Sequence, residues 1–220
     1  MMTLLFLLSA AAVQDAEPGD VSTLQAGARF TFPGGAISGI GSVGYHELLG
    51  TGIGAELQGA RLWRVSRRVS LGAYLEADED FFPGGGRIPG LFGTTVKTQS
   101  SSAFRLLGGA KIREEFGASH FYSEQMLGFG AIFHSGIRGD VSNGMNDAEL
   151  FARTVRFGMD VGATIGLSVS RQWETFVTLA MQLNGGPGEG RDIAIIAPNF
   201  SGNANTQLNF GVTLGLNIRF

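Results

Sequence analysis

Apolar and polar residues alternate along most of the chain, and the alternation is clearest at the C-terminal end. From Leu208 to Phe220 every second residue is apolar, and each residue between them is polar or glycine. Successive side chains of a β-strand point to opposite faces, so this period of two predicts a strand with one apolar and one polar face. After residue 20 no segment carries a convincing stripe with the 3.6-residue period of a helix. The pattern therefore predicts an all-β protein.

Seven further segments repeat the alternation, less regularly in the second, fourth and fifth predicted strands. They lie at about 23–32, 52–64, 69–78, 103–113, 120–133, 159–169 and 173–182. With the C-terminal segment they make eight strands of about 10–13 residues, whereas ordinary strands have about 5–6. A tilted strand that crosses a membrane needs about 9–11 residues. The strand lengths favour a membrane barrel over a soluble β-sandwich, which alternation alone also fits.

The connections between these strands differ in length in a regular way. Short connections fall near Ser66-Arg67-Arg68, Glu114–Ser119 and Ser170-Arg171-Gln172, and long glycine-rich loops near 33–50, 79–101, 134–150 and 184–206. Short turns on one side and long loops on the other are typical of outer-membrane barrels, with the short turns and both termini in the periplasm. The sequence therefore predicts an eight-stranded antiparallel up-and-down transmembrane β-barrel.

Charged residues of the predicted strands fall on the polar face. They are Arg29, Glu56, Glu76, Arg105, Lys111, Glu124, Asp160, Glu174 and Arg219. A charge facing the middle of the lipid layer costs about 2–4 kcal/mol, so this segregation predicts that the polar face is the barrel interior. The interior of an eight-stranded barrel is filled by side chains, and its buried charges must pair. Inward-facing glycines are expected to make room for these long side chains, at Gly27, Gly72, Gly128, Gly162, Gly166, Gly211 and Gly215.

Four aromatic residues lie on the apolar face beside the short connections: Trp63, Phe121, Trp173 and Phe220. We expect them to form an aromatic girdle at the periplasmic membrane interface. A soluble sandwich has no reason to carry outward aromatics around one end.

An apolar run opens the chain, from Leu4 to Val13, and the small residues Ala10 and Ala12 follow the pattern of a signal-peptidase site. The sequence predicts a cleaved signal peptide at 1–12, a short linker at 13–20 and the barrel at 21–220. No Lys or Arg precedes the apolar run, which departs from the usual signal pattern.

The composition agrees with a membrane barrel and excludes several other classes. Hydrophobic residues make up 44% of the chain and charged residues 16%, against about a quarter charged in soluble domains. The absence of cysteine excludes disulfides and thiolate metal sites. A net charge of −3 without a basic cluster argues against nucleic acid as a partner. No cofactor is expected.

The closing stretch NFGVTLGLNIRF resembles the terminal strand of bacterial outer-membrane barrels, and FYSEQMLGFGA resembles a central strand of the OmpA/OmpX/OmpW-like small barrels. The resemblance covers about 21–220. It implies a barrel fold, an outer-membrane location, contact with outer-membrane lipid, and recognition of the C-terminal strand by the barrel-assembly machinery. It implies no particular activity.

Two sequence patterns suggest cofactor or metal chemistry, and neither has its required context. Gly39-Ile40-Gly41-Ser42-Val43-Gly44 has the GxGxxG spacing of a dinucleotide site, but no βαβ unit surrounds it. His46, His120 and His134 lack the i, i+4 spacing of a helical zinc site.

A third pattern concerns lipid modification. Asp140-Val141-Ser142-Asn143-Gly144 is similar to the His-x-Ser-Asn stretch of PagL-like lipid A deacylases, but Asp140 stands where the histidine should be. A serine needs an adjacent base to act as a nucleophile. His134 and Glu149 are the groups that would have to approach it, yet a turn built from these small polar residues is the favoured interpretation.

Two apolar runs interrupt the predicted loops, Phe81-Phe82-Pro83 and 193–197. Exposed apolar runs can mark an interaction surface, but we favour hairpins that extend above the membrane and pack on each other.

The predicted function is that of a monomeric, non-enzymatic barrel with a structural or surface-interaction role. The alternative is that the barrel passes or binds small solutes, hydrophobic ones among them. Lipid-modifying catalysis ranks third.

Overall fold

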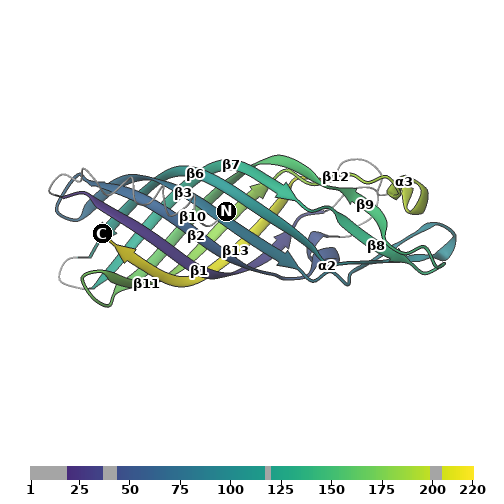
Figure 1. Ribbon diagram of the computed structural model, residues 1–220, viewed down its shortest axis with the longest axis horizontal. Coiled ribbons are helices and arrows are strands. Elements are labelled where there is room, and N and C mark those ends of the chain that lie inside the picture. Colours follow the sequence, from purple (N-terminus) through teal and green to yellow (C-terminus); the bar gives the residue numbers. More distant parts are fainter. Residues whose placement is uncertain (1–18, 37–43, 117–119, 199–204) are drawn as a thin grey trace.

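Eight long strands close into one antiparallel barrel, which confirms the predicted fold (Figure 1). The computed structural model describes residues 19–36, 44–116, 120–198 and 205–220. The barrel strands are β1 (Val21–Gly34), β2 (Gly52–Arg64), β3 (Val69–Phe82), β6 (Ser101–Glu115), β7 (Phe121–His134), β10 (Thr154–Ser168), β11 (Trp173–Asn184) and β13 (Gln207–Arg219). Around the barrel they follow the order β1-β13-β11-β10-β7-β6-β3-β2, and β1 closes the ring by pairing with both β13 and β2. The predicted signal peptide lies outside the described residues.

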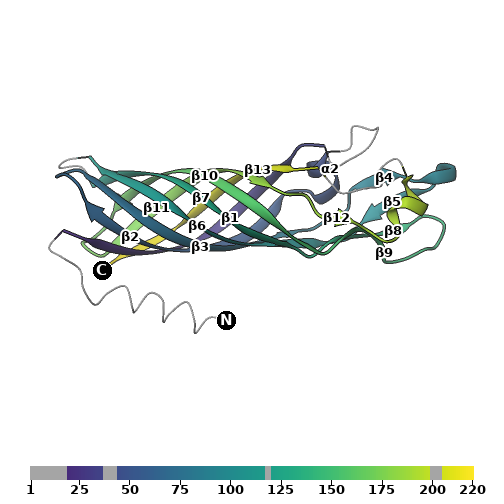
Figure 2. The ribbon, with the colours of Figure 1, turned by 90° about the horizontal axis from the view of Figure 1, so that it is seen from above.

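The long connections contain regular structure, so their interpretation as loops is wrong in part. Residues 79–82 belong to β3 and residue 101 to β6, and further short elements lie between the barrel strands. These are α2 (Tyr45–Leu49), β4 (Arg87–Pro89), η1 (Leu91–Gly93), β5 (Thr95–Thr98), β8 (Ile137–Val141), β9 (Ala148–Ala152), β12 (Gly188–Glu189) and α3 (Ile193–Ile196). The five short strands form a second sheet in the order β12-β9-β8-β5-β4. We call it the extracellular sheet, because it projects from the long-loop end of the barrel (Figures 1 and 2).

Side chains of the barrel strands alternate between lipid and interior. Along β11 the residues from Trp173 to Asn184 alternate between exposed and buried. The outward side chains are apolar except for Thr175, and Glu174 and Gln182 lie inside. The outward residues Trp173 and Leu183 mark the two ends of this apolar face. At about 3.3 Å per residue and a tilt of about 40°, they lie about 25 Å apart along the membrane normal, the height of an outer-membrane apolar band. Among the described residues, no helix is long and apolar enough to cross a membrane.

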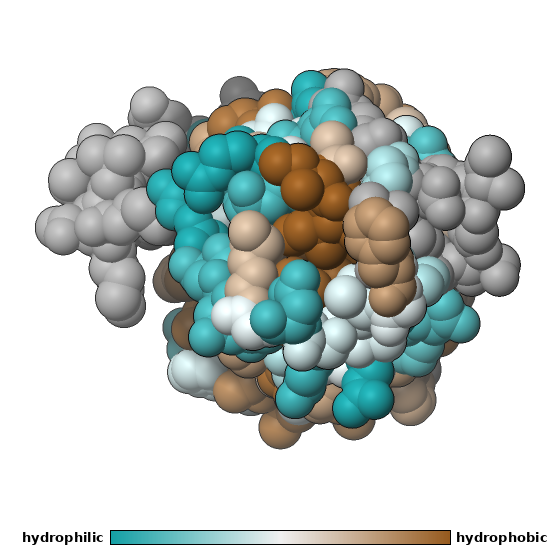
Figure 3. Space-filling model, turned by 90° about the vertical axis from the view of Figure 1, so that its right-hand side faces the viewer, coloured by the Kyte–Doolittle hydropathy of each residue, from teal (hydrophilic) through white to brown (hydrophobic). Residues whose placement is uncertain are grey.

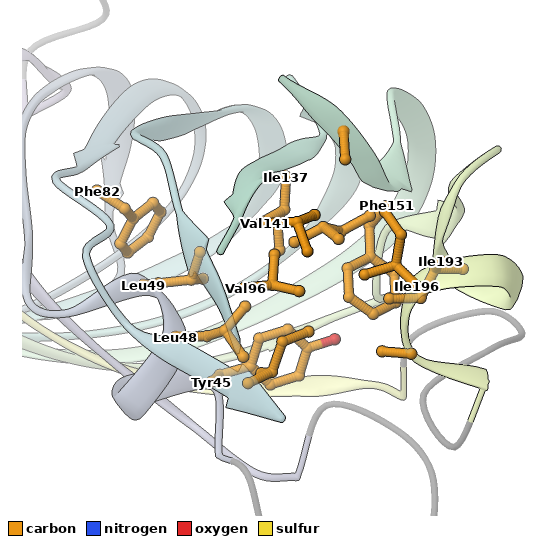
Figure 4. Packing of buried hydrophobic residues seen from close by; sticks show 14 of the residues in the cluster. Tyr45, Leu48, Leu49, Phe82, Val96, Ile137, Val141, Phe151, Ile193 and Ile196 are labelled. Atoms are coloured by element: carbon orange, nitrogen blue, oxygen red, sulfur yellow. The ribbon is translucent and has the colours of Figure 1, made fainter. Parts of the chain in front are cut away.

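The main apolar core lies beyond the barrel, under the extracellular sheet (Figure 4). Tyr45 and Leu48 of α2 belong to one buried cluster with Val96 of β5, Phe151 of β9 and Ile193 of α3. Burial raises the pKa of the Tyr45 hydroxyl, which donates a 2.6 Å hydrogen bond to the backbone carbonyl of residue 205. The extracellular connections therefore form a folded unit with a core of its own.

The two apolar runs of the connections divide between this core and the surface. Phe82, Ile193 and Ile196 are buried in the core, whereas Phe81 and Ile195 are 53% and 72% exposed. The expectation that these segments pack on each other is confirmed for the buried residues only.

Glycines leave space for tyrosines inside the barrel, as expected from the sequence. A Cβ atom at Gly128 would overlap the Tyr74 hydroxyl, and one at Gly166 would overlap the Tyr122 ring. Neither glycine has room for a methyl group. Each tyrosine can therefore occupy its position only because the residue beside it has no side chain.

We expect Gly166→Ala to lower the free energy of unfolding by about 1–3 kcal/mol, because the new methyl group overpacks the Tyr122 ring. Urea titration of the protein folded in lipid vesicles measures this. Gly59→Ala is the matched control, since a Cβ there meets no atom within 4 Å. Equal stability of the two variants would show that the Tyr122 ring moves without cost.

Candidate functional site

The barrel interior holds the charged side chains that the sequence predicts there. Eight of the nine are at most 5% exposed, and the Arg219 side chain, at the periplasmic mouth, is 22% exposed. They lie in two clusters, one in the extracellular half of the barrel and one in the periplasmic half.

The extracellular cluster is centred on two arginines. Nη1 of Arg29 lies 3.1 Å from Oε2 of Glu56 and 3.8 Å from Oδ2 of Asp78, and its Nε lies 3.7 Å from Oδ1 of Asp80. Arg105 forms ion pairs with Asp78 and Asp80 through its Nη2. The two aspartates therefore join β1 to β6 through β3. This arrangement follows from the register, in which Asp78 lies opposite both Glu56 and Arg105.

The periplasmic cluster is closed by a bidentate contact. Arg113 donates to both carboxylate oxygens of Glu174, at 2.6 and 2.9 Å, and lies 3.2 Å from Glu124. Lys111 lies 2.8 Å from Glu124, and Arg219 lies 3.3 Å from Glu174. The Arg113 guanidinium also stacks on the Tyr122 ring, 3.7 Å from its centroid. Bidentate pairs of this kind fix the relative positions of the strands that carry them.

Gln58 connects the two clusters. Its amide nitrogen donates to Glu76 at 2.8 Å, while its carbonyl oxygen accepts from Lys111. Asp160, the remaining predicted residue, accepts from Gln182 at 2.8 Å. One polar network therefore runs through most of the barrel's length.

The predicted set lacks four charged members of the network, namely Asp78, Asp80, Arg113 and Glu115. The alternation could have predicted them, because each lies an even number of residues from a predicted inward residue on its own strand. Asp80 falls two residues beyond the end of the predicted strand, in a segment interpreted as a loop. The amide Gln58 has the parity of Glu56, so the alternation also places it inward, but its bonding partners depend on which residues lie across the barrel from it.

The charged groups of the extracellular cluster are closely packed. Arg29, Asp80, Arg105 and Asp160 are 0% exposed, and Glu56 is 5% exposed. At the periplasmic mouth a cavity of about 440 Å³ is lined by Arg113, Arg171, Arg219 and His120, among others. The interior is thus open near the periplasm and filled further in.

The four predicted interface aromatics lie outward at the periplasmic end of the barrel. Trp63 is 46%, Phe121 52%, Trp173 47% and Phe220 60% exposed. Further exposed phenylalanines, outside the predicted set, lie nearer the extracellular end, where the rings of Phe129 and Phe157 stack with their centroids 6.2 Å apart.

Large apolar side chains are exposed at the far end of the extracellular unit. Phe92 is 98% exposed and has a φ of 54°, while Met145 is 45% and Ile195 72% exposed. We call these three residues the apolar tip. Viewed from this end, hydrophobic residues gather in a hollow bordered by hydrophilic ones (Figure 3).

Ser142 and His134, two of the residues considered for catalysis, are not brought together. Ser142 lies in the turn after β8, where its Oγ accepts a hydrogen bond from the Thr95 backbone N–H. His134 lies at the end of β7, and its Nε2 is 2.8 Å from the Gly185 carbonyl oxygen. The five residues of β8 lie between the two in an extended conformation, which at about 3.3 Å per residue covers about 15 Å.

Asp140 has a structural role in that turn. Its carboxylate accepts hydrogen bonds from the Asp147 backbone N–H at 3.0 Å and from the Gln99 amide at 2.9 Å, and these bonds lower its pKa. This agrees with a turn in place of a catalytic motif.

The remaining cofactor and metal candidates gain no support. His46 lies in α2 and is exposed, and His120 lies at the periplasmic end. Within the described ranges, no three His, Cys, Asp or Glu side chains are placed to hold a metal ion. The GxGxxG stretch, apart from Gly44, lies outside the described residues.

Comparison with known proteins shows the class of protein. No protein-family model and no curated protein matches the sequence. A major outer membrane protein of Thermus thermophilus has a TM-score of 0.51 and 11% identity, covering 92% of this chain and 100% of that one. Ail, the attachment invasion locus protein of Yersinia pestis, has a TM-score of 0.48 and 9% identity, covering 92% and 100%. OprG of Pseudomonas aeruginosa has a TM-score of 0.44 and 11% identity, covering 94% and 99%.

At these identities the similarity shows the fold, which is that of the small outer-membrane β-barrels. The closed barrel with an outward apolar band belongs to the bacterial outer membrane.

Removing Arg105 leaves Asp78 with its longer contact to Arg29, and Asp80 with its longer contact to Arg29 and a 2.8 Å hydrogen bond from the Thr31 hydroxyl. We expect Arg105→Met to lower the free energy of unfolding by about 3–5 kcal/mol, the cost of breaking a buried pair. Urea titration in vesicles measures this loss, and adding Asp78→Asn and Asp80→Asn should restore part of it. Arg87→Met, at an exposed arginine of β4, is the control and should change stability by less than about 0.5 kcal/mol. A similarly small change in Arg105→Met would contradict a bracing role for the network.

Proposed function

We propose that this protein is a monomeric, non-enzymatic barrel that presents a rigid surface-interaction site outside the cell. The observation that carries the proposal is the extracellular sheet, which has a buried core and an exposed apolar tip. In this proposal the ion-pair network braces the barrel, and the barrel holds the sheet away from the membrane. The C-terminal strand β13 serves recognition by the assembly machinery.

The apolar tip supports an interaction role because its residues are costly to leave exposed. Full burial of a Phe, Ile or Met side chain is worth about 1.5–3 kcal/mol, and the extracellular core buries neighbouring residues such as Ile193 and Ile196. Phe92 also adopts a left-handed backbone conformation, which costs a bulky residue about 1–3 kcal/mol. A partner surface that covers the tip would recover this burial.

The filled interior argues against the alternative of solute passage. Charged groups with zero exposure block the extracellular half of the barrel, and moving them apart would separate buried ion pairs. The separation of Ser142 from His134, and the hydrogen bonds that each already makes, argue against lipid-modifying catalysis.

We expect replacement of the apolar tip by serines (Phe92→Ser/Met145→Ser/Ile195→Ser) to weaken surface adhesion at least about fivefold, because three apolar contacts are lost. Adhesion of cells displaying the protein to polystyrene, and their aggregation with one another, measure this. Val65→Ser removes a similarly exposed residue at the periplasmic end and serves as the control. Unchanged adhesion of the tip variant, with equal amounts at the cell surface, would refute the proposal.

In planar lipid bilayers the purified protein should give no stepwise ionic current above that of a protein-free bilayer. The reason is that the charged groups around Arg29 and Arg105 are buried and paired across the barrel, so a passing ion would have to separate them. Regular single-channel steps would favour the solute-passage alternative instead.

A further inference from the structure

Two periplasmic turns share one sequence pattern and one hydrogen-bonding arrangement. They are Val65-Ser66-Arg67-Arg68-Val69 and Val169-Ser170-Arg171-Gln172-Trp173. In each, the backbone N–H groups of the first two residues donate to the carbonyl of the fifth, at 2.9–3.1 Å. The serine Oγ accepts from the backbone N–H groups of the fourth and fifth residues, at 3.3 and 3.1 Å. Backbone groups and one serine therefore hold each turn, and the arginine side chains take no part in it.

These arginines have no side-chain partner within the described parts of the chain. Arg67, Arg68 and Arg171 are exposed, and their side chains form neither an ion pair nor a hydrogen bond there. The other arginines of this end are already neutralised.

The neutralised arginines use most of the nearby carboxylates. Arg64 and Arg219 both approach Glu115, at 3.6 and 3.2 Å, and Arg61 lies 3.5 Å from Asp20. Glu114 is exposed and is the remaining carboxylate of this end among the described side chains. The three unpaired arginines therefore outnumber the available carboxylates, and this rim carries an excess of positive charge.

The arginines lie on two opposite sides of the barrel. In the closed order β1-β13-β11-β10-β7-β6-β3-β2, the pair β1 and β13 separates the β2–β3 and β10–β11 hairpins on one side. The pair β6 and β7 separates them on the other. Unpaired positive charge thus lies on both sides of the ring, and Arg171 also lines the cavity at the periplasmic mouth.

The arginines also lie close to the level of the membrane interface. Outward-facing tryptophans mark that interface, and Trp63 and Trp173 lie just before Arg67 and just after Arg171 in the sequence. At about 3.3 Å per residue along a tilted strand, the arginines fall within about 10 Å of the tryptophans. The headgroup layer is about 5–8 Å thick on each side of the hydrocarbon core. The arginine backbones therefore lie at or just beyond the headgroup layer, and their long side chains can bring the guanidinium groups back to the level of the lipid phosphates.

We propose that these residues form a periplasmic basic belt, made of Arg67, Arg68 and Arg171 with Trp63 and Trp173, that binds anionic phospholipid headgroups. A guanidinium group matches a phosphate with two parallel hydrogen bonds, and the tryptophans hold it at the right depth. The belt selects phosphatidylglycerol-like lipids over zwitterionic ones, since only the former neutralise the excess charge.

The two belt tryptophans are the only tryptophans of the chain, so their fluorescence reports on this rim alone. The protein is folded into lipid nanodiscs that contain brominated phosphatidylglycerol or, at the same mole fraction, brominated phosphatidylcholine. We expect the quenching to correspond to about a threefold preference for phosphatidylglycerol around the wild-type belt. The preference should disappear in Arg67→Gln/Arg68→Gln/Arg171→Gln and fall in about 1 M NaCl, which screens exposed charges.

The matched control is Arg87→Gln/Lys97→Gln/Arg191→Gln, which removes three exposed cations from the extracellular unit and must keep the preference. Equal quenching by both lipids in the wild type, or a preference that persists in the belt variant or is lost in the control, would overturn the proposal. If the belt variant does not fold, the salt titration of the wild type decides: a preference that the added salt leaves unchanged excludes headgroup pairing.

Discussion

The architecture depends on the fact that hydrocarbon offers no hydrogen-bond partner to a peptide group. A strand in lipid must have both neighbours, so the sheet has to close, and β1 pairs with both β2 and β13. Closure creates an outside that must be apolar and an interior that lipid never reaches. Polar side chains within the membrane are therefore placed inside, where they must find partners among themselves.

This requirement explains the composition of the interior. In the extracellular half, Arg29 and Arg105 face Asp78 and Asp80, and in the periplasmic half Arg113 pairs with Glu174. Buried ion pairs contribute little net stability compared with well-packed apolar groups, but breaking one is costly. The network is therefore better understood as fixing strand register, since a slip of one residue would turn these charges into the lipid.

The two ends of the barrel meet different surroundings. At the periplasmic end two of the turns are short, each held by backbone hydrogen bonds and one serine, and they carry the exposed arginines of the proposed basic belt. At the extracellular end the chain returns to water, and apolar residues can again form a conventional core, with Leu48, Val96 and Phe151 among its members. The barrel thus separates a periplasmic rim of short turns from a folded extracellular sheet.

The alternation along the chain is enough to predict the barrel strands, their faces and the end at which the girdle aromatics lie. A period of two can be read from one segment alone, and lipid requires apolar side chains on the outer face of every strand. The odd or even position of a residue along its strand is therefore enough to place Arg29, Glu174 and Trp173 on the correct face. Pairing between distant segments sets the rest. The short strands β4, β5, β8, β9 and β12 are each too short to carry a pattern of their own. Two local hairpins, β4–β5 and β8–β9, join into one sheet only because β5 pairs with β8 and β9 with β12, which lie far apart in the chain. The same reason applies to Gln58, whose partners lie on other strands, because register is a property of two segments that neither encodes alone.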